Sequence, residues 1–431
     1  MRFVMEQYYR EQARDLPVAG EYDIIVAGSG PAGVSAAINA GRMGVRVLLL
    51  EWNNAVGGIS TSGLMSHFTG SVHSRFYTEL LQAMADRNEG AGKGKIVSSI
   101  DPENLKSIYL DMLKEAGVTV LLFTFVCGTV MDGNRVIGVI TESKSGRRVF
   151  RAKICIDGTG DGDVAAFAGV PFYKGRESDG KMQPVTLMFK VAGVDTERAV
   201  LLGSFESTHQ TEKGELQALA KKHIPYPAGH LLVYRSTLPG IITCNMTNCT
   251  EIDGTSAEDL TRAELVCRSQ MPAIVAYLRE FVPGFEHCFI ISAGSMMGVR
   301  ESRHFRGEYI LHEDDILSAR IFDDWVVRGA HFNFDVHNLT GAGLDKTGVQ
   351  HKWSQPKGYT IPYRCLLPVG VEGLLLSGRN ISGTHMAHSN YRVMPICAGI
   401  GEAAGIAAAI AVKDNIRLRD VPVEKIQEYL I

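Results

Sequence analysis

A glycine-rich segment near the start of the chain has the spacing of a dinucleotide-binding loop. Gly28, Gly30 and Gly33 occupy the three glycine positions of a G-x-G-x-x-G motif, and Pro31 and Ala32 stand between the last two. In such a loop the first glycine makes a tight turn, the second lets the backbone approach a pyrophosphate, and the third lets a helix pack closely against a sheet. The start of that helix offers free N–H groups and a partial positive charge to phosphates. The segment therefore predicts a bound dinucleotide.

A carboxylate and the surrounding elements strengthen this prediction. The apolar run Asp23–Ala27 predicts a buried strand before the loop, Pro31–Met43 predicts a helix after it, and Val45–Leu50 predicts a second strand. Glu51 follows 18 residues after Gly33 (51 − 33), where a carboxylate accepts hydrogen bonds from ribose hydroxyl groups. A lone glycine motif is a weak signal, but here a strand, a helix, a second strand and an acidic residue come in the required order.

A second pair of glycines bears on the choice between FAD and NAD. Gly57 and Gly58, followed by Ser60 and Thr61, resemble the second phosphate-contacting segment of glutathione-reductase-like flavoproteins. Residues 53–55 are Asn, Asn and Ala, so the arginine often found near that pair is absent. The pair favours FAD and leaves open how the pyrophosphate is neutralised.

Two further glycine turns follow short apolar runs. Gly158 and Gly160 come after a predicted strand and suit a turn that returns to the adenosine side of a flavoprotein. The aspartates of this turn do not form a calcium loop, because the twelfth position is alanine rather than glutamate. Gly378, Arg379 and Asn380 come after a second predicted strand and resemble the segment near the ribityl phosphate of FAD.

The end of the chain predicts a helix that approaches the flavin. The segment Pro395–Val412 is apolar and rich in small residues, including Gly399 and Gly401. Small residues let a helix come close to a flat ligand. Its positive N-terminal end would stabilise negative charge at N1 and O2 of a reduced flavin. A core helix of small residues is the alternative.

Taken together, these segments resemble the FAD-dependent oxidoreductase family of the glutathione-reductase-like superfamily. The resemblance covers nearly the whole chain after the first ~20 residues and includes Met297–Tyr309 and Ile361–Pro368. It implies FAD and an α/β fold with a three-layer ββα, Rossmann-like FAD-binding domain and an inserted mixed α+β substrate domain. It does not imply a particular substrate.

The order of predicted elements places that insertion in the middle of the chain. We expect an N-terminal extension over 1–20, the first part of the FAD-binding domain over 21–171, a substrate domain over 172–355, and the second FAD-binding part over 356–431. A helical insertion over 71–116 interrupts the first part, and a β-meander follows over Val118–Arg151. In the insertion, Pro184–Val191 predicts a strand, and Asp259–Phe281 and Glu313–Arg328 predict helices.

Composition excludes several other classes of protein. The 431 residues are 45% hydrophobic and 21% charged, as in an ordinary soluble globular protein, and the net charge is −3. No basic stripe points to nucleic acid, and no apolar run reaches the ~18–20 residues of a membrane helix. The eight cysteines are scattered, and no segment resembles a signal peptide. We expect a cytoplasmic protein with free thiols, no metal and a small-molecule substrate; a homodimer is compatible with the sequence.

Candidate catalytic residues lie just before the last helix and in the resemblance segment Met297–Tyr309. His385 and His388, three residues apart, suit a general base near neutral pH, and Arg392 would bind a substrate anion. Arg300 is a further candidate, although ion pairing with its neighbours is the structural alternative. If neither histidine is the base, His67, His304 and Tyr363 are the next candidates. Glu301-x-x-His304 is half of a di-iron motif, and no second half accompanies it.

The predicted function is hydride transfer between a small polar substrate and flavin N5. The same site could reduce an activated double bond or a disulfide, although no C-x-x-C motif supports the latter. A non-catalytic or tRNA-modifying FAD-binding factor is the alternative from another class, and the net charge of −3 argues against it.

Overall fold

A parallel sheet forms around the strand that leads into the glycine loop. A computed structural model describes residues 9, 11–87, 94, 96–344 and 358–431. Five parallel strands lie in the order β4 (Thr119–Leu121), β2 (Val47–Leu50), β1 (Val18–Ala27), β7 (Arg148–Asp157) and β18 (Leu374–Leu376). All four residues of β2 are buried, as expected for a strand covered on both faces. β1 begins at Val18, within the predicted N-terminal extension.

The register of this sheet brings the predicted cofactor segments to one edge. Ala27 pairs with Leu50 and with Asp157, and Asp157 pairs with Leu376. Each of these residues is the last of its strand, so the loops that follow begin side by side. Ligands of open α/β sheets bind at this carboxyl edge. Residues separated by more than 300 positions therefore meet there.

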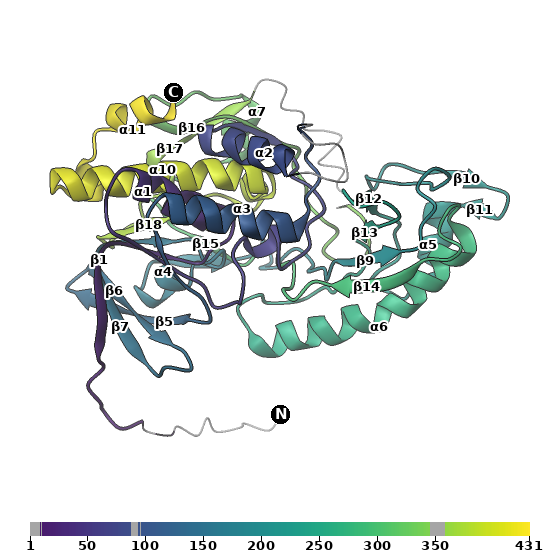
Figure 1. Ribbon diagram of the computed structural model, residues 1–431, viewed down its shortest axis with the longest axis horizontal. Helices are drawn as coiled ribbons and strands as arrows, with labels where there is room; N and C mark the ends of the chain where they lie inside the picture. Colours follow the sequence, from purple (N-terminus) through teal and green to yellow (C-terminus); the bar gives the residue numbers. More distant parts are fainter. Residues whose placement is uncertain (1–8, 10, 88–93, 95, 345–357) are drawn as a thin grey trace.

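An antiparallel meander extends the same sheet. It contains β5 (Phe125–Asp132), β6 (Arg135–Glu142) and the first half of β7, with β6 paired to β5 and β7. The strand expected separately over 154–157 is the second half of β7, which pairs with β18. Figure 1 shows this meander below the helices, near the N-terminal segment.

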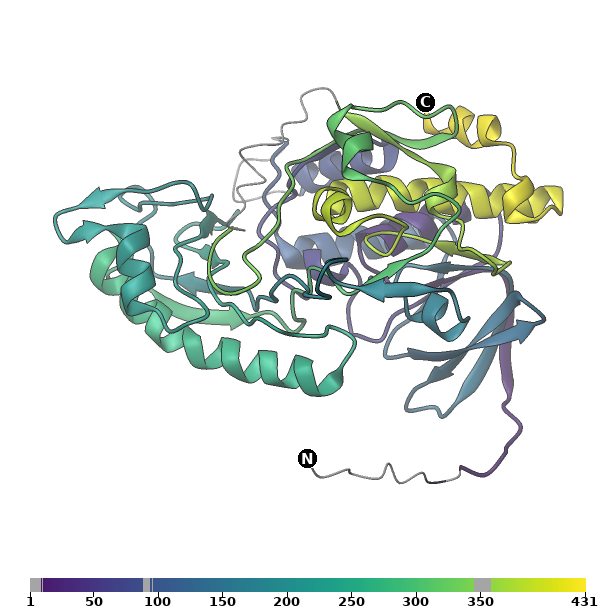
Figure 2. The same cartoon turned by 180° about the vertical axis from the view of Figure 1, so that it is seen from behind.

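Two helices pack face to face over the parallel sheet. α1 (Pro31–Arg42) and α10 (Met394–Asp414) lie side by side in Figures 1 and 2. Glycines make this approach possible: a Cβ on Gly401 would stand 2.1 Å from the Ala32 carbonyl oxygen, and one on Gly405 would stand 2.2 Å from that of Ala36. Two helices on the same layer are α2 (Arg75–Asp86) and α3 (Pro102–Glu115); the Asp101 carboxylate caps α3.

By length and composition, α10 could cross a membrane, whereas no segment of this kind was expected from the sequence. Glu402 interrupts the run, while the mean hydropathy of the helix stays high. Of its most apolar window, 94% is buried inside the protein, which is the property of a core helix. We therefore assign α10 to the hydrophobic core.

A small antiparallel sheet covers the other face of α10. It consists of β3 (Ser71–His73), β16 (Trp325–His331) and β17 (Tyr359–Pro362). The helix expected over 313–328 was wrong: α7 covers only Glu313–Leu317, and β16 follows. Ala319 has a φ of 50°, which a right-handed helix cannot accommodate, so the helical segment stops before it. The helical insertion expected over 71–116 likewise begins with a strand, β3.

A second sheet has a hydrophobic core of its own. Its order is β12 (Val233–Arg235), β13 (Ile242–Cys244), β9 (Phe189–Ala192) and β14 (Phe289–Ala293), all antiparallel. The long helix α6 (Ala257–Phe281) runs along it, as its periodicity predicted, and forms a separate lobe with it in Figures 1 and 2.

The core of this second unit spans a narrower range than the expected 172–355. Its buried residues fall between Val185 and Cys288, whereas Phe305, Ile316 and Val327 pack in the first core. The expected boundary at 355/356 lies outside the described residues.

The remaining elements are α4 (Asp163–Phe167), β8 (Phe172–Lys174), β10 (Gln210–Thr211), β11 (Gly214–Glu215), α5 (Leu216–His223), β15 (Arg303–Phe305), α9 (His385–Tyr391), α11 (Val423–Leu430) and short 3-10 turns at Gly58–Ser60, Tyr363–Cys365 and Leu418–Asp420.

Candidate functional site

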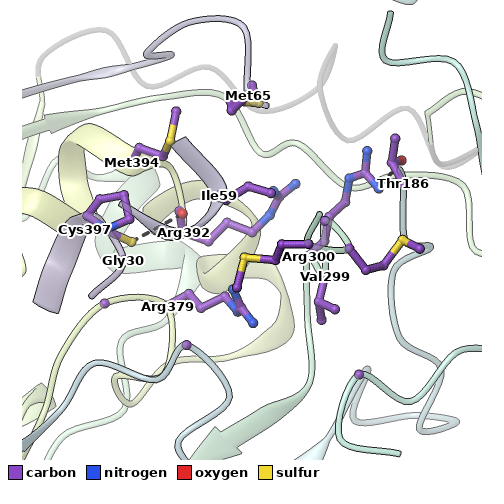
Figure 3. Close-up of a pocket in the computed structure, with 18 of the residues that line it drawn as sticks. Gly30, Ile59, Met65, Thr186, Val299, Arg300, Arg379, Arg392, Met394 and Cys397 are labelled. Atoms are coloured by element: carbon purple, nitrogen blue, oxygen red, sulfur yellow. Dashed lines mark hydrogen bonds between the residues drawn. The ribbon is translucent and has the colours of Figure 1, made fainter. Parts of the chain in front are cut away.

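A cavity of about 1040 Å³ lies between the carboxyl edge of the parallel sheet and the second unit. Figure 3 shows Gly30, Met394 and Cys397 on one side of it and Thr186, Val299 and Arg300 on the other, with Arg392 between them. Small-molecule sites usually measure ~300–1,000 Å³. This cavity is therefore large enough for a cofactor together with a second molecule.

The glycine loop forms one wall of the cavity in the way that FAD requires. Gly28, with a φ of 85°, makes the turn, and a Cβ on Gly33 would stand 1.9 Å from the Gly28 carbonyl oxygen. A Cβ on Gly30, by contrast, would meet nothing within 4 Å, so this glycine borders open space. Pro31 and Ala32 begin α1 beside it, and no side chain caps this helix start. The free N–H groups of the helix are thus left for a phosphate.

Glu51 reaches the same wall. Its Oε2 accepts hydrogen bonds from the Ser29 N–H (2.9 Å) and hydroxyl (2.5 Å), and its Oε1 accepts one from the Asn53 N–H (2.9 Å). The carboxylate lines the cavity while only 4% of the residue is exposed. These contacts hold an acceptor at the end of β2, where the adenosine ribose of FAD is expected.

The other predicted cofactor segments divide into lining and supporting residues. Those that line the cavity are Gly58, Gly158, Gly160, Gly378 and Arg379. Arg379 donates to the Asp161 carboxylate at 2.6 Å and is the cation on this side of the cavity. Four others lie behind the wall and shape the turns: Gly57 has a φ of 104°, the hydroxyls of Ser60 and Thr61 donate to the carbonyls of Gly57 and Val56, and the Asn380 amide donates to the Asp157 carbonyl.

The predicted glycines of α10 do not lie on the cavity. A Cβ on Gly399 would contact Val72 and one on Gly401 would contact Ala32, so both serve helix packing. The first turn of α10 lines the cavity instead, through Met394 and Cys397. The N-terminal end of α10 therefore borders the cavity through residues one turn before the predicted glycines.

Polar and charged residues line the part of the cavity that borders the second unit. Arg392 pairs with Asp335 at 2.9 Å, and His337 Nε2 lies 3.4 Å from the same carboxylate. Arg300 donates to the Pro184 carbonyl (2.6 Å) and the Thr186 hydroxyl (2.9 Å). Burial acts to raise the pKa of Asp335, but His337 and the two arginines lower it further than burial raises it. Burial lowers the pKa of His337 to about 4, so this imidazole is neutral at neutral pH.

His67 is a second cavity histidine. Its Nδ1 lies 2.8 Å from the Ser66 hydroxyl, and its ring lies 4.7 Å from the Tyr234 ring. Burial lowers its pKa, which keeps the imidazole neutral near pH 7. A neutral imidazole that faces a cavity is suited to accept a proton.

Comparison with known proteins identifies the family. The sequence profile of the family "FAD dependent oxidoreductase" matches residues 23–430, nearly the entire chain. The chain belongs to this family. FAD is thus its cofactor, as the loops predicted, and the protein is an oxidoreductase enzyme with a Rossmann-like parallel sheet.

Relatives of this FAD-dependent oxidoreductase have different activities. Digeranylgeranylglycerophospholipid reductase 1 of Methanococcoides burtonii is 26% identical over 201 residues, which are 42% of this chain and 47% of that protein. Thiamine thiazole synthase of Pyrococcus abyssi is 30% identical over 175 residues, 38% of this chain and 67% of that protein. The chain thus matches about half the length of the first relative. The flavin-dependent brominase Bmp2 shares the fold, with a TM-score of 0.53 at 13% identity over 95% of this chain and 83% of its own.

The two histidines expected to face the substrate in this FAD-dependent oxidoreductase do not line the cavity. His385 Nδ1 lies 2.5 Å from Glu301 Oε1, which also lies 2.8 Å from His304 Nε2. His388 is buried beside the His304 ring, and burial lowers its pKa well below the usual value. The prediction that His385 and His388 act on substrate is therefore not supported by their position. Arg392 and Arg300, the other two predicted residues, do line the cavity.

Glu301, His304 and His385 are ligand types with donor atoms within 4.8 Å of one another. Their hydrogen bonds account for this grouping, because the Glu301 carboxylate receives both imidazoles and the Gln183 N–H. In the sequence these residues stand apart, as Glu301-x-x-His304 and, 84 residues after Glu301, His385, so the cluster could not be recognised before the fold was known.

Several cavity residues were not identified from the sequence. These are Ile59, Met65, Thr186, Tyr234, Asn245, Asp335, His337 and Cys397. Asp335 and His337 form an Asp-x-His pair, a combination of residue types found in many active sites. No local sequence pattern, however, indicates that this pair faces the cavity. The apolar residues carry no signal that separates them from core positions.

Proposed function

We propose that this FAD-dependent oxidoreductase transfers a hydride between flavin N5 and a small polar substrate held against the second unit, which acts as the substrate domain. One observation carries the proposal: the glycine loops and the polar residues of the second unit line one cavity. The narrower assignment to a glutathione-reductase-like arrangement is part of this proposal, supported by the parallel sheet, the meander and the ends of the chain meeting at one edge.

When bound, FAD supplies an acceptor or donor of two electrons and one proton as hydride. The residues of this chain must then manage the second proton. Oxidation of an alcohol or amine releases a hydride and a proton, and we assign the proton to the Nε2 of His67, in the tautomer whose Nδ1–H donates to the Ser66 hydroxyl. Arg300, Arg392 and Tyr234 would orient the polar groups of the substrate.

Replacement of His67 tests this assignment. His67→Ala should retain FAD and slow anaerobic flavin reduction by ~100- to 10,000-fold, the usual contribution of a general base. His209→Ala, at an exposed position that does not line the cavity, is the control and should reduce at the wild-type rate. Equal rates in His67→Ala and the control would place the base elsewhere.

The experiment that tests the function is anaerobic bleaching of the bound flavin by sugars, cyclitols, hydroxy acids and amines. A substrate should bleach the visible absorbance of the bound flavin by about as much as dithionite does, at a rate that saturates with substrate concentration. Failure of every compound in both directions of transfer would reject hydride exchange with small polar molecules.

The reverse reaction is a second candidate. A hydride from the reduced flavin and a proton from His67 would then saturate an activated double bond. The similarity to a digeranylgeranylglycerophospholipid reductase supports testing this reaction with the photoreduced enzyme. A disulfide substrate fits less well. The structure describes all eight cysteines, and of these only Cys397 lines the cavity. Burial raises the pKa of its thiol to about 12.

A further inference from the structure

The charged residues at the substrate side of the cavity do not balance. Two guanidinium groups, of Arg300 and Arg392, face one carboxylate, Asp335. Arg392 pairs with that carboxylate at 2.9 Å, and His337 approaches it at 3.4 Å as a neutral ring. The pair Arg392–Asp335 is therefore neutral as a unit, and Arg300 supplies one uncompensated positive charge.

Arg300 has neutral hydrogen-bond partners only. Its Nη1 donates to the Pro184 carbonyl and the Thr186 hydroxyl, and no carboxylate of the described residues forms an ion pair with it. These two contacts use one terminal nitrogen of a five-donor fork. Burial and then Arg392 lower the pKa of Arg300 to about 10, which leaves the group charged at neutral pH.

The other acidic residues on the cavity lie away from this group. Glu51, Asp161 and Asp163 are at the loop side, where Ser29, Arg379 and Arg303 engage them in that order. Glu264 pairs with Arg268 and is partly exposed, and Glu206 is exposed. None of them forms an ion pair with Arg300. Arg300 is partly exposed on the cavity wall, so the guanidinium N–H groups that its two protein contacts leave free are available to an anion in the cavity.

We propose that Arg300, with Arg392 beside it, binds a carboxylate group of the substrate and thereby orients the substrate across the cavity. The inference rests on the proposed function in one respect: the molecule that carries the carboxylate is the one that exchanges a hydride. The planar fork of arginine matches the two oxygens of a carboxylate.

Charge decides between a carboxylate and a phosphate. The site has one net positive charge after Arg392 and Asp335 cancel, which a monoanion neutralises. A phosphate monoester carries about −1.5 to −2 at pH 7 and would leave excess negative charge next to Asp335. Neutral donors and rings nearby, such as Asn245 and Tyr234, suit the remainder of a small organic acid.

The test is titration of the oxidised, FAD-loaded enzyme by calorimetry and by the shift of flavin absorbance. The probes are acetate, lactate and benzoate, the neutral amides of these acids, and inorganic phosphate. We expect at least one carboxylate to bind ~10-fold or more tightly than its amide, and Arg300→Gln to weaken that carboxylate by ~10- to 100-fold, because a charge-assisted pair is lost. Amide binding should be unaffected.

Matched variants separate this effect from loss of fold. Arg300→Lys keeps the charge without the planar fork and should weaken the carboxylate less than Arg300→Gln does. Arg364→Gln removes an arginine that pairs with Asp324 outside the cavity, and it should bind carboxylates like the wild type. The flavin absorbance of each variant verifies that it is folded and loaded, and if Arg300→Gln fails this check, Arg300→Lys alone decides.

The possible outcomes distinguish this inference from the proposed function. Carboxylate binding that depends on Arg300, without flavin bleaching by any compound, supports the subsite and counts against hydride transfer. Bleaching by neutral alcohols or amines, with no carboxylate preference, supports hydride transfer and overturns the subsite. Phosphate binding tighter than every carboxylate, or carboxylate binding equal in Arg300→Gln and wild type, also overturns it.

Discussion

Replacing Gly30 by valine should weaken FAD binding by about 150-fold while the protein stays folded. Gly30 precedes α1 with φ −63° and ψ 178°, an extended conformation that any residue adopts, and its Cβ would meet nothing within 4 Å. The cost to the free energy of unfolding should stay within about 1 kcal/mol, the scale of exchanging a glycine cap for a poorer one. The side chain would occupy the space into which the pyrophosphate must come.

The expected loss of FAD affinity follows from the contacts that valine blocks. The free N–H groups at the start of α1 would each make a charge-assisted hydrogen bond worth about 1.5–3 kcal/mol. Loss of one or two of them gives roughly 3 kcal/mol, or about 150-fold in Kd. Equilibrium titration of apoprotein with FAD measures this change, and thermal or urea unfolding of the same apoprotein measures stability.

Gly33→Ala is the matched control, since it adds fewer atoms to the same loop. Its Cβ would stand 1.9 Å from the Gly28 carbonyl oxygen, so the backbone must shift. Overpacking of this kind costs about 1–3 kcal/mol of stability or more. The smaller substitution should therefore destabilise the apoprotein more than the larger one. Wild-type FAD affinity in Gly30→Val, or greater stability of Gly33→Ala than of Gly30→Val, would refute the reasoning.

Three further predictions concern the carboxylate, the helix pair and a buried histidine. Glu51→Ala should weaken FAD binding by about 1–3 kcal/mol, whereas an unchanged Kd would remove Glu51 from the ribose site. Gly401→Ala should lower the free energy of unfolding by about 1–3 kcal/mol, because its Cβ would stand 2.1 Å from the Ala32 carbonyl oxygen; full stability in urea would contradict the close helix contact. Burial lowers the pKa of His337 from 6.5 to about 4, so the folded protein binds fewer protons than the unfolded chain between these values. His337 therefore contributes stability that is present above pH 6.5 and lost as the pH falls toward 4. Between pH 8 and pH 5 the free energy of unfolding should fall by about 2 kcal/mol on this account. His337→Asn should show a smaller fall when urea unfolding is measured at these two pH values.

The sequence by itself determined the elements whose signals are local. The loop at Gly28–Gly33 was predicted because its conformation depends on a strand, a turn and a helix that are contiguous in the chain. α6 was predicted within two residues at its start, because burial on one face imposes a helical period on 25 consecutive residues. The same kind of pattern failed at 313–328, where one left-handed residue, Ala319, ends the helix.

Only the tertiary structure decided which side chains share the cavity. His385 and His388 were placed correctly beside the last helix, but a contact with Glu301, 84 residues away, turns α9 so that His385 faces the protein interior. Arg392 lies on the cavity because Asp335, 57 residues away, holds it there. The direction of a side chain depends on packing partners that are distant in the chain, and neither residue type nor spacing encodes those partners. For this reason the sequence determined the cofactor, while the fold determined which residues can touch a substrate.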